Sequence, residues 1–129
     1  MGSMKLEELR VYQMSMDIAE RVWAIVSKWD YFGKDTIGKQ LVRAADSVSA
    51  NLSEGFGRYH FKDAKNFGYY SCGSLYETKT WLTKAHSRKL ISDSDFQNFI
   101  SDIDSIGIKL NNYINSIGKV KDTPLPNDN

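Results

Sequence analysis

Apolar residues recur along this chain at alternating three- and four-residue steps in four separate stretches. That spacing keeps apolar side chains on one stripe of an α-helix, so each stretch predicts an amphipathic helix with one face towards a core. The stripes of the last three stretches consist of Ile37, Leu41, Ala44, Val48 and Leu52; of Ala64, Gly68, Ser71, Leu75, Thr78, Leu82 and Ala85; and of Phe96, Phe99, Ile103, Ile106, Leu110, Tyr113 and Ile117.

Polar and glycine residues between the stripes set the expected boundaries of the first two helices. The first helix is expected over about 6–29, followed by a short connection over 30–34. Asp35 can then accept hydrogen bonds from the first free backbone N–H groups of the second helix and cap it. We expect Gly55 and Gly57 to end that helix, because glycine adopts the left-handed conformation at low cost.

The second half of the chain predicts two further helices. The third is expected over about 59–88 and is followed by a turn over 89–91. Ser92 or Ser94 can cap the fourth helix, and Gly118 is the expected stop. Four helices joined by short connections predict an all-α fold, an antiparallel up-down-up-down four-helix bundle.

The first helix carries two apolar seams instead of one. The seams are displaced by two or three residues, and two residues correspond to about 200° of helix rotation, so they face nearly opposite directions. The first seam consists of Leu9, Tyr12, Met16, Ala19, Trp23 and Val26, and the second of Val11, Met14, Ile18, Val22, Ile25 and Trp29.

A helix that is apolar on two sides needs partners on two sides. We expect the first seam to face the bundle core and the second, from Val11 to Trp29, to form an oligomer interface. The alternative is that the first helix lies centrally within the monomer, although four-helix bundles rarely bury one member so fully. The pattern therefore predicts a self-associating protein.

The length of 129 residues favours one domain with a single core, expected over 4–118. Residues 1–3 have the pattern of a cloning remnant, and the polar, proline-containing stretch 119–129 is expected to be a disordered tail. The single cysteine, Cys72, cannot form an intrachain disulfide, which predicts a cytoplasmic protein. No stretch is long and apolar enough to predict a membrane span.

The stretch from Gln40 to Arg58, QLVRAADSVSANLSEGFGR, resembles the signature of the 23S rRNA intervening-sequence proteins, also called the four-helix bundle protein family. A second family element, G-S-L-x-E, lies in the third predicted helix. The matching residues are Gln40, Leu41, Arg43, Ala44, Ala45, Ser47, Asn51, Glu54, Gly55 and Arg58 in the first element, and Gly73, Ser74, Leu75 and Glu77 in the second.

The resemblance covers the chain from about Leu6 to Gly118 and implies structural roles for Asn51, Glu54, Gly55, Ser74 and Glu77. It also implies homo-oligomers, with a ring-shaped homopentamer favoured. The family includes accessory proteins of diversity-generating retroelements, which bind nucleic acid and a reverse transcriptase. RNA or DNA and a reverse transcriptase are therefore expected partners besides the chain itself.

Basic residues on an outer face would bind the nucleic acid. The candidates are Lys39, Arg43, Arg58, Lys62 and Lys65. The competing interpretation is that these residues form salt bridges with neighbouring carboxylates. Two departures from the family pattern weaken a polyanion-binding face: Val42 replaces a second basic residue, and Asp46 stands where an apolar residue is usual. The net charge of +1 also argues against a dedicated nucleic-acid binder.

Catalytic and metal-binding patterns are not found in the sequence. His60 and His86 have no second ligand at metal-binding spacing, and the paired Glu-x-x-His motif of di-iron bundles is absent. The leading prediction is thus a non-enzymatic assembly or adaptor module without a cofactor. The alternative is a dedicated nucleic-acid-binding accessory protein of a reverse transcriptase, and a second alternative is an enzyme with an unrecognised site.

Overall fold

The computed structural model of the chain describes residues 4–119, in which helices alternate with short connections and no strand occurs. The second long helix is built from three consecutive pieces, one of which is a short π-helix. The elements in order are the 3₁₀ turn η1 (Leu6–Glu8), α1 (Arg10–Val26), α2 (Tyr31–Gly33), the π-helical η2 (Lys34–Gly38), α3 (Lys39–Phe56), α4 (Phe61–Ser87) and α5 (Asp93–Ser116).

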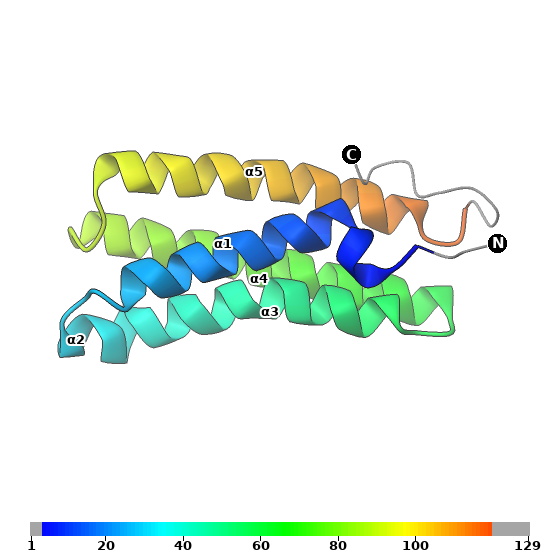
Figure 1. Ribbon diagram of the computed structural model, residues 1–129, viewed down its shortest axis with the longest axis horizontal. Helices are drawn as coiled ribbons and strands as arrows, with labels where there is room; N and C mark the ends of the chain where they lie inside the picture. Colours follow the sequence, from blue (N-terminus) through cyan, green and yellow to red (C-terminus); the bar gives the residue numbers. More distant parts are fainter. Residues whose placement is uncertain (1–3, 120–129) are drawn as a thin grey trace.

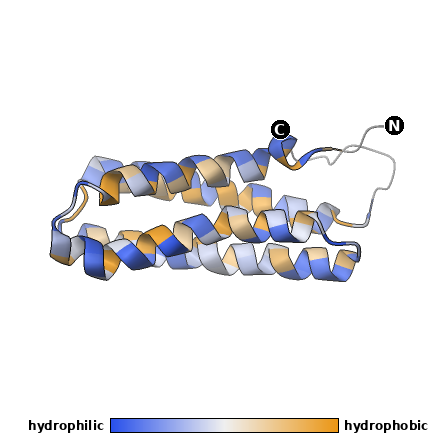
Figure 2. Cartoon of the chain, turned by 60° about the horizontal axis from the view of Figure 1, so that its bottom comes forward, coloured by the Kyte–Doolittle hydropathy of each residue, from blue (hydrophilic) through white to orange (hydrophobic). Residues whose placement is uncertain are grey.

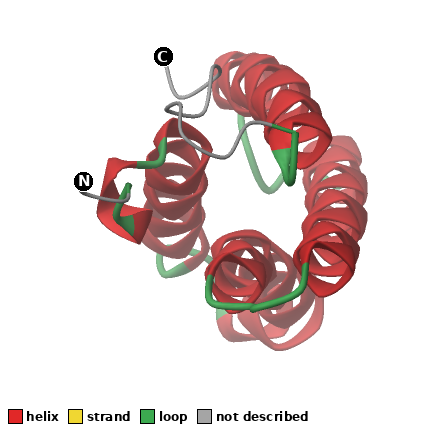
Figure 3. Ribbon diagram, turned by 90° about the vertical axis from the view of Figure 1, so that its right-hand side faces the viewer, coloured by secondary structure: helices red, strands yellow, loops and turns green. Residues whose placement is uncertain are grey.

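The long helices pack side by side as a four-helix bundle, as the periodicity predicts (Figure 1). Figure 3 looks along the bundle and shows the helices arranged around a common centre. α1 packs on α3 and α5, while α4 packs on α3 and α5 from the other side. Each helix alternates hydrophobic and hydrophilic residues along its length (Figure 2). The predicted ring-shaped oligomer is not tested by the structure of one chain.

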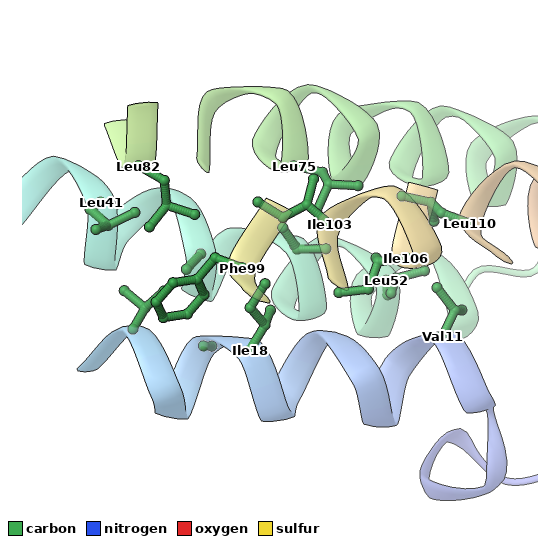
Figure 4. Packing of buried hydrophobic residues seen from close by; sticks show 14 of the residues in the cluster. Val11, Ile18, Leu41, Leu52, Leu75, Leu82, Phe99, Ile103, Ile106 and Leu110 are labelled. Carbon is green, nitrogen blue, oxygen red and sulfur yellow. The ribbon is translucent and has the colours of Figure 1, made fainter. Parts of the chain in front are cut away.

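The core runs along the bundle axis and takes side chains from every long helix. Each stripe residue of α4 is buried, and so are most stripe residues of α3 and α5, which confirms the spacing argument for these three helices. Buried residues labelled in Figure 4 are Val11 and Ile18 of α1; Leu41 and Leu52 of α3; Leu75 and Leu82 of α4; and Phe99, Ile103, Ile106 and Leu110 of α5.

α3 and α4 form the closest helix pair, because small residues line the surface between them. A Cβ atom on Gly55 would lie 2.8 Å from the Cβ of Phe67 and 3.0 Å from the backbone oxygen of Ala64. Gly55 is therefore needed for helix approach. The helix ends at Phe56 with Gly57 as its C-cap, which confirms the predicted end between Gly55 and Gly57.

The start of the second long helix also differs from the prediction. Asp30 is the N-cap, and its side chain accepts a hydrogen bond of 2.8 Å from the backbone N–H of Gly33. Residues 31–34 are therefore helical and not a connection, and Asp35 lies within the helix, where its carboxylate pairs with Lys39 at 2.9 Å. Asp30 and Asp35 are both residues that N-cap positions favour, so residue type alone does not distinguish them.

Other boundary predictions are close to the structure. Ser92 caps α5 by accepting a hydrogen bond from the backbone N–H of Asp95, so the choice between Ser92 and Ser94 falls on the first. Gly118 adopts a φ of 80°, as expected for a stop after α5, whereas Gly57 has a φ of −85° and is not left-handed. The predictions for residues 1–3 and for the tail beyond Lys119 lie outside the described residues.

Candidate interaction surfaces

The second apolar seam of α1 faces the core, contrary to the prediction. The first seam is divided, because Leu9, Ala19 and Val26 are buried in the core while Met16 and Trp23 are exposed. Val11, Ile18 and Val22 are 1%, 1% and 0% exposed because their own chain covers them, and they belong to the core. Met14 and Ile25 are partly buried against that core, and Trp29 is buried. The predicted oligomer interface of Val11, Met14, Ile18, Val22, Ile25 and Trp29 is therefore wrong, because this seam is the bundle-facing side of α1.

The outward side of α1 carries members of the other seam. Trp23 is 61% exposed and Met16 is 42% exposed. Residue type does not separate the two seams in the sequence, because each contains one tryptophan, and Trp29 is buried whereas Trp23 is exposed. Sequence reasoning missed Trp23 as a surface residue because both seams have the same heptad spacing.

Trp23 forms one wall of a groove of about 560 Å³ between α1 and the helix from Lys34 to Arg43, which we call the Trp23 groove. Val26 and Val42 provide apolar lining. Gly38 allows the two helices to approach here, because a Cβ on this residue would lie 2.8 Å from the Cγ1 of Val26. The remaining lining residues are Ser27, Lys34, Gly38, Lys39 and Arg43.

The cations at the Trp23 groove are only partly neutralised. Lys39 pairs with Asp35 at 2.9 Å, and this contact raises the pKa of Lys39. Lys34 and Arg43 have no carboxylate within salt-bridge distance among residues 4–119. The groove thus combines an exposed indole, an apolar lining and two cations without an ion-pair partner.

Two carboxylates lie beside the Trp23 groove and near enough to interact: Glu20, one turn before Trp23 in α1, and Asp46, one turn after Arg43 in α3. Burial raises the pKa of the Asp46 carboxyl, and the nearby charge of Glu20 raises it further. Within the described part of the chain, neither carboxylate has a basic partner. Among residues 4–119, Asp46 makes no salt bridge with the basic candidates, and the charged neighbour that affects its pKa is another acid.

The five candidate nucleic-acid residues do not form one site. Lys39 and Arg43 line the Trp23 groove near the start of α3. Arg58, Lys62 and Lys65 lie at the junction of α3 and α4, and Arg58 pairs with Glu54 at 2.9 Å as the salt-bridge interpretation expected. Lys39 begins α3 and Arg58 lies just beyond its end, and a helix of the 18 residues from Lys39 to Phe56 is roughly 27 Å long.

The junction of α3 and α4 presents a second surface with basic and aromatic residues. Beside it, a groove of about 490 Å³ lies between the start of α4 and the residues that follow α5. Its lining includes Phe61, Lys62, Lys65 and Tyr69 of α4, and Ile117, Gly118 and Lys119 after α5. Phe61 and Tyr69 are exposed, and the Arg58 guanidinium lies 4.8 Å from the ring centre of Phe67. This surface places aromatic rings beside cations.

The outward face of α4 is also rich in tyrosine. Tyr69, Tyr70 and Tyr76 are exposed, and Tyr69 and Tyr76 lie two turns apart on one side of the helix. Gly73 lies between them, and a Cβ on it would meet no atom within 4 Å. A mid-helix glycine costs about 1 kcal/mol relative to alanine, and among residues 4–119 no contact uses the small size of Gly73.

His86 and Cys72 lie outside these surfaces. His86 contacts the Asp93 carboxylate at 2.5 Å and stacks on Phe96, so it links the ends of α4 and α5. Burial raises the pKa of the half-buried Cys72 thiol. Residues 4–119 contain no group of three potential metal ligands, and no helix among them has the length and apolarity needed to cross a bilayer.

The fold and these surfaces can now be compared with known proteins. The family model for the 23S rRNA-intervening sequence protein matches residues 7–112. The chain belongs to this family. No curated protein matches the sequence significantly.

A solved structure has the same fold. It is a protein of unknown function from the S23 ribosomal protein family of Bacteroides thetaiotaomicron, with a TM-score of 0.73. The match covers 81% of this chain and 97% of that chain, at 21% sequence identity. At this identity the likeness establishes the fold alone.

In this member of the 23S rRNA-intervening sequence protein family, the signature residues lie mostly along α3 and α4. Asn51 donates hydrogen bonds to the backbone oxygen of Ser47, at 3.0 Å, and to the hydroxyl of Ser74, at 3.5 Å. Glu77 accepts a hydrogen bond from the Trp81 indole at 3.2 Å. The motif glycines differ, because Gly55 is in contact with α4 while Gly73 faces open space.

Proposed function

We propose that this chain is a non-enzymatic, self-associating helical bundle that serves as an assembly or adaptor module. The observation that supports it is the Trp23 groove, where an indole 61% exposed lies beside further apolar side chains on α1 and α3. Clustered apolar groups on a surface favour protein association, and tryptophan is frequent among the residues that dominate binding energy. The outward side of α1, with Met16 and Trp23, thus replaces the second seam as the proposed contact surface.

A closed ring would need a second contact surface on each subunit, because head-to-tail interfaces join two different patches. The tyrosine face of α4 has the required properties. Tyr69 and Tyr76 supply apolar area, and Gly73 would let a neighbouring helix approach closely. The homopentamer that the family resemblance favours remains a prediction, as does a cytoplasmic location.

The experiment is a mass measurement in solution at low micromolar concentration, by light scattering or sedimentation. We expect an oligomer for the natural chain and a loss of at least tenfold in association for Trp23→Glu. Tyr59→Ser is the control, because this aromatic residue is even more exposed than Trp23 but lies in the connection between α3 and α4. A natural chain that stays monomeric throughout this range would refute the proposal.

The second candidate function is nucleic-acid binding, as an accessory protein of a reverse transcriptase. The surface at the junction of α3 and α4 favours it, because Lys62 and Lys65 lie beside the exposed Phe61 and Tyr69. Lysines bind phosphates while aromatic rings stack on bases, a combination typical of single-strand binders. Lys39 and Arg43 lie at the other end of α3, so this candidate site does not include them.

Titration of labelled structured RNA and single-stranded DNA at several salt concentrations tests this candidate. Phosphate contacts give an affinity that falls steeply as salt rises. We expect Lys62→Glu with Lys65→Glu to weaken binding at least tenfold, and Arg43→Glu to leave it unchanged. An affinity that does not depend on salt, or an equal loss from Arg43→Glu, would contradict this assignment.

A further inference from the structure

The Trp23 groove carries two cations that its own chain leaves unpaired. Among residues 4–119, Lys34 and Arg43 make no ion pair. Both line an apolar groove beside the Trp23 indole. In a groove-to-groove contact between two copies, these cations would oppose each other, and like charges that meet in an interface are costly. The groove therefore suits a different surface, one that brings a carboxylate.

The tyrosine face of α4 carries such a carboxylate. Glu77 follows Gly73 by one turn and Tyr70 by two turns, so the three residues lie on the same side of the helix. Glu77 is exposed, and it accepts a hydrogen bond from the Trp81 indole. No cation of the described chain lies within salt-bridge distance of Glu77. The tyrosine face thus has the charge that the groove lacks.

The same face of α4 has a notch at Gly73. Tyr69 and Tyr76 are separated by two turns, or about 10 Å along the helix axis, and Gly73 lies between them without a side chain. A Cβ on Gly73 would meet no atom within 4 Å, so the notch is open. A planar side chain from outside can rest there on the helix backbone between two tyrosine rings. Trp23 is such a side chain, because it is 61% exposed.

We propose that the Trp23 groove of one copy receives the tyrosine face of α4 of the next copy. In this contact the Trp23 indole covers Gly73. At the edge of the groove, Arg43 pairs with Glu77. The proposal rests on the proposed self-association and assigns its two contact surfaces to each other.

Such a contact joins two different patches, so it is head-to-tail, the type that closes into rings. One copy can make both contacts at once, because α1 and α4 lie diagonally across the bundle. Each of them packs on α3 and α5, and the four helices surround a common centre (Figure 3). The groove beside α1 and the outward face of α4 therefore point in different directions.

The register follows from the spacing on both surfaces. Glu77 lies one turn, or about 6 Å, beyond Gly73 along α4. Arg43 and Trp23 line the same groove from neighbouring helices, and the long side chain of Arg43 is exposed. An indole that rests on Gly73 therefore leaves Glu77 within reach of the guanidinium. The tyrosine rings would then shield the apolar lining of the groove from water.

Exchange of the two charges tests the pairing of Arg43 with Glu77. Arg43→Glu and Glu77→Lys should each weaken association at least tenfold, because each places like charges in the contact. A chain with both substitutions has the charges exchanged, so it should recover the mass of the natural assembly. Asp63→Lys is the matched control, because it reverses the other acid of α4, which lies in the first turn. The measurement is mass in solution at low micromolar concentration.

A mixture of two disabled chains tests whether the contact is head-to-tail. Trp23→Glu disables the groove and leaves the tyrosine face intact, whereas Gly73→Leu fills the notch and leaves the groove intact. We expect each variant alone to be monomeric. Their equimolar mixture at high micromolar concentration should contain dimers with one copy of each variant and nothing larger. In a groove-to-groove contact, Gly73→Leu would still dimerise by itself.

The melting temperature separates loss of contact from loss of fold. A Cβ on Gly73 meets no atom, and glycine weakens a helix, so Gly73→Leu should not lower the melting temperature of the dissociated chain. Gly68→Leu is the contrast, because a Cβ there would lie 2.5 Å from the Cγ1 of Ile114. A melting temperature of Gly73→Leu that falls together with the mass would overturn the assignment of Gly73 to the contact.

The outcomes for self-association and for the pairing differ. A natural chain that is monomeric at every concentration would end both. A natural oligomer whose mass is unchanged by Glu77→Lys and by Gly73→Leu would overturn the pairing alone, and the groove would then receive another surface. Single variants that dissociate while the charge-exchanged chain does not reassemble would also overturn it. So would a mixture of Trp23→Glu and Gly73→Leu that stays monomeric.

Discussion

The hydroxyl of Ser71 in α4 donates a hydrogen bond of 2.9 Å to the backbone oxygen of Val48 in α3. Both residues are buried, and they are 23 positions apart in the chain. Such a contact is possible only because small residues let the two helices approach closely. The stripe of small residues on α4, which the sequence predicts to face inward, therefore lies against α3.

Ser71→Ala should lower the free energy of unfolding by about 1 kcal/mol, the usual net value of a buried hydrogen bond. Chemical denaturation monitored by circular dichroism measures this change. Ser53→Ala is the matched control, because the Ser53 hydroxyl donates its hydrogen bond to the backbone oxygen of Ala50 within the same helix. An equal loss in the two variants would show that the contact between helices contributes nothing specific.

Two glycines of α4 should respond in opposite directions to the same substitution. A Cβ on Gly68 would lie 2.5 Å from the Cγ1 of the buried Ile114, so Gly68→Ala should cost about 1–3 kcal/mol through overpacking. Gly73 faces open space, so Gly73→Ala should stabilise the helix by about 0.5–1 kcal/mol in the monomer.

Urea denaturation of the two glycine variants checks this prediction. Both substitutions lie in α4, so they can be compared directly. If Gly73→Ala also lowers the mass in solution, the tyrosine face of α4 takes part in assembly. Equal destabilisation by both substitutions would contradict the packing that the structure assigns to Gly68.

The ion pair between α1 and α5 should make a small, salt-dependent contribution. Arg21 contacts Asp102 at 2.6 Å and lies 5.1 Å from the ring centre of Phe99. Burial lowers the pKa of Arg21, but the contacts with Asp102 and Asp17 outweigh this and raise it. Because both side chains are more than a third exposed, a double-mutant cycle with Arg21→Ala and Asp102→Ala should give a coupling of about 0.5 kcal/mol.

This coupling should shrink when the salt concentration rises, because solvent ions screen exposed charges. Arg21→Lys should retain part of the ionic contact but lose the planar stacking on Phe99. A coupling that is independent of salt would indicate that the two residues interact through packing and not through charge.

Asp46 should make the stability of the monomer depend on pH. Because its pKa is raised in the folded chain, the folded state holds this proton to a higher pH than the unfolded state. The ionised carboxylate thus destabilises the fold at neutral pH, and this penalty disappears as the pH falls below the ordinary pKa of Asp. Asp46→Asn should accordingly raise the melting temperature at pH 7 and change it less at pH 3–4.

Melting curves of the natural chain and Asp46→Asn between pH 3 and pH 7 check this prediction, at a concentration too low for self-association. Asp63→Asn is the control for removing one exposed acid, because Asp63 lies in the first turn of α4 and not beside another carboxylate. A difference between the natural chain and Asp46→Asn that grows as the pH falls would have the wrong sign and contradict the assignment.

The sequence predicts the inner faces of three helices correctly because each of them has one apolar stripe. In α4, the stripe from Ala64 to Ala85 is buried at every position, including its polar members Ser71 and Thr78. Period alone determines such a face, since residues three and four apart must lie on the same side of a helix. Family membership, too, was visible in the linear motifs, and the matching model confirms it.

The sequence could not decide which seam of α1 faces the core. Both seams satisfy the heptad rule, and only the positions of α3 and α5 make Val11, Ile18 and Val22 the covered set. The same limit applies to the basic candidates, because Lys39 and Arg58 are both cationic but lie at different ends of α3. Glu20 was an ordinary surface acid until the fold placed it near Asp46.

By itself, then, the sequence determined the four helices, the stripe that each of the last three turns inward, and the family. These properties depend on spacing within one helix, which the linear order of residues specifies completely. The tertiary structure decided which face of α1 is outward, where the Trp23 groove lies and which charges face each other. Those properties depend on contacts between helices, and residues far apart in the chain meet only once the bundle has packed.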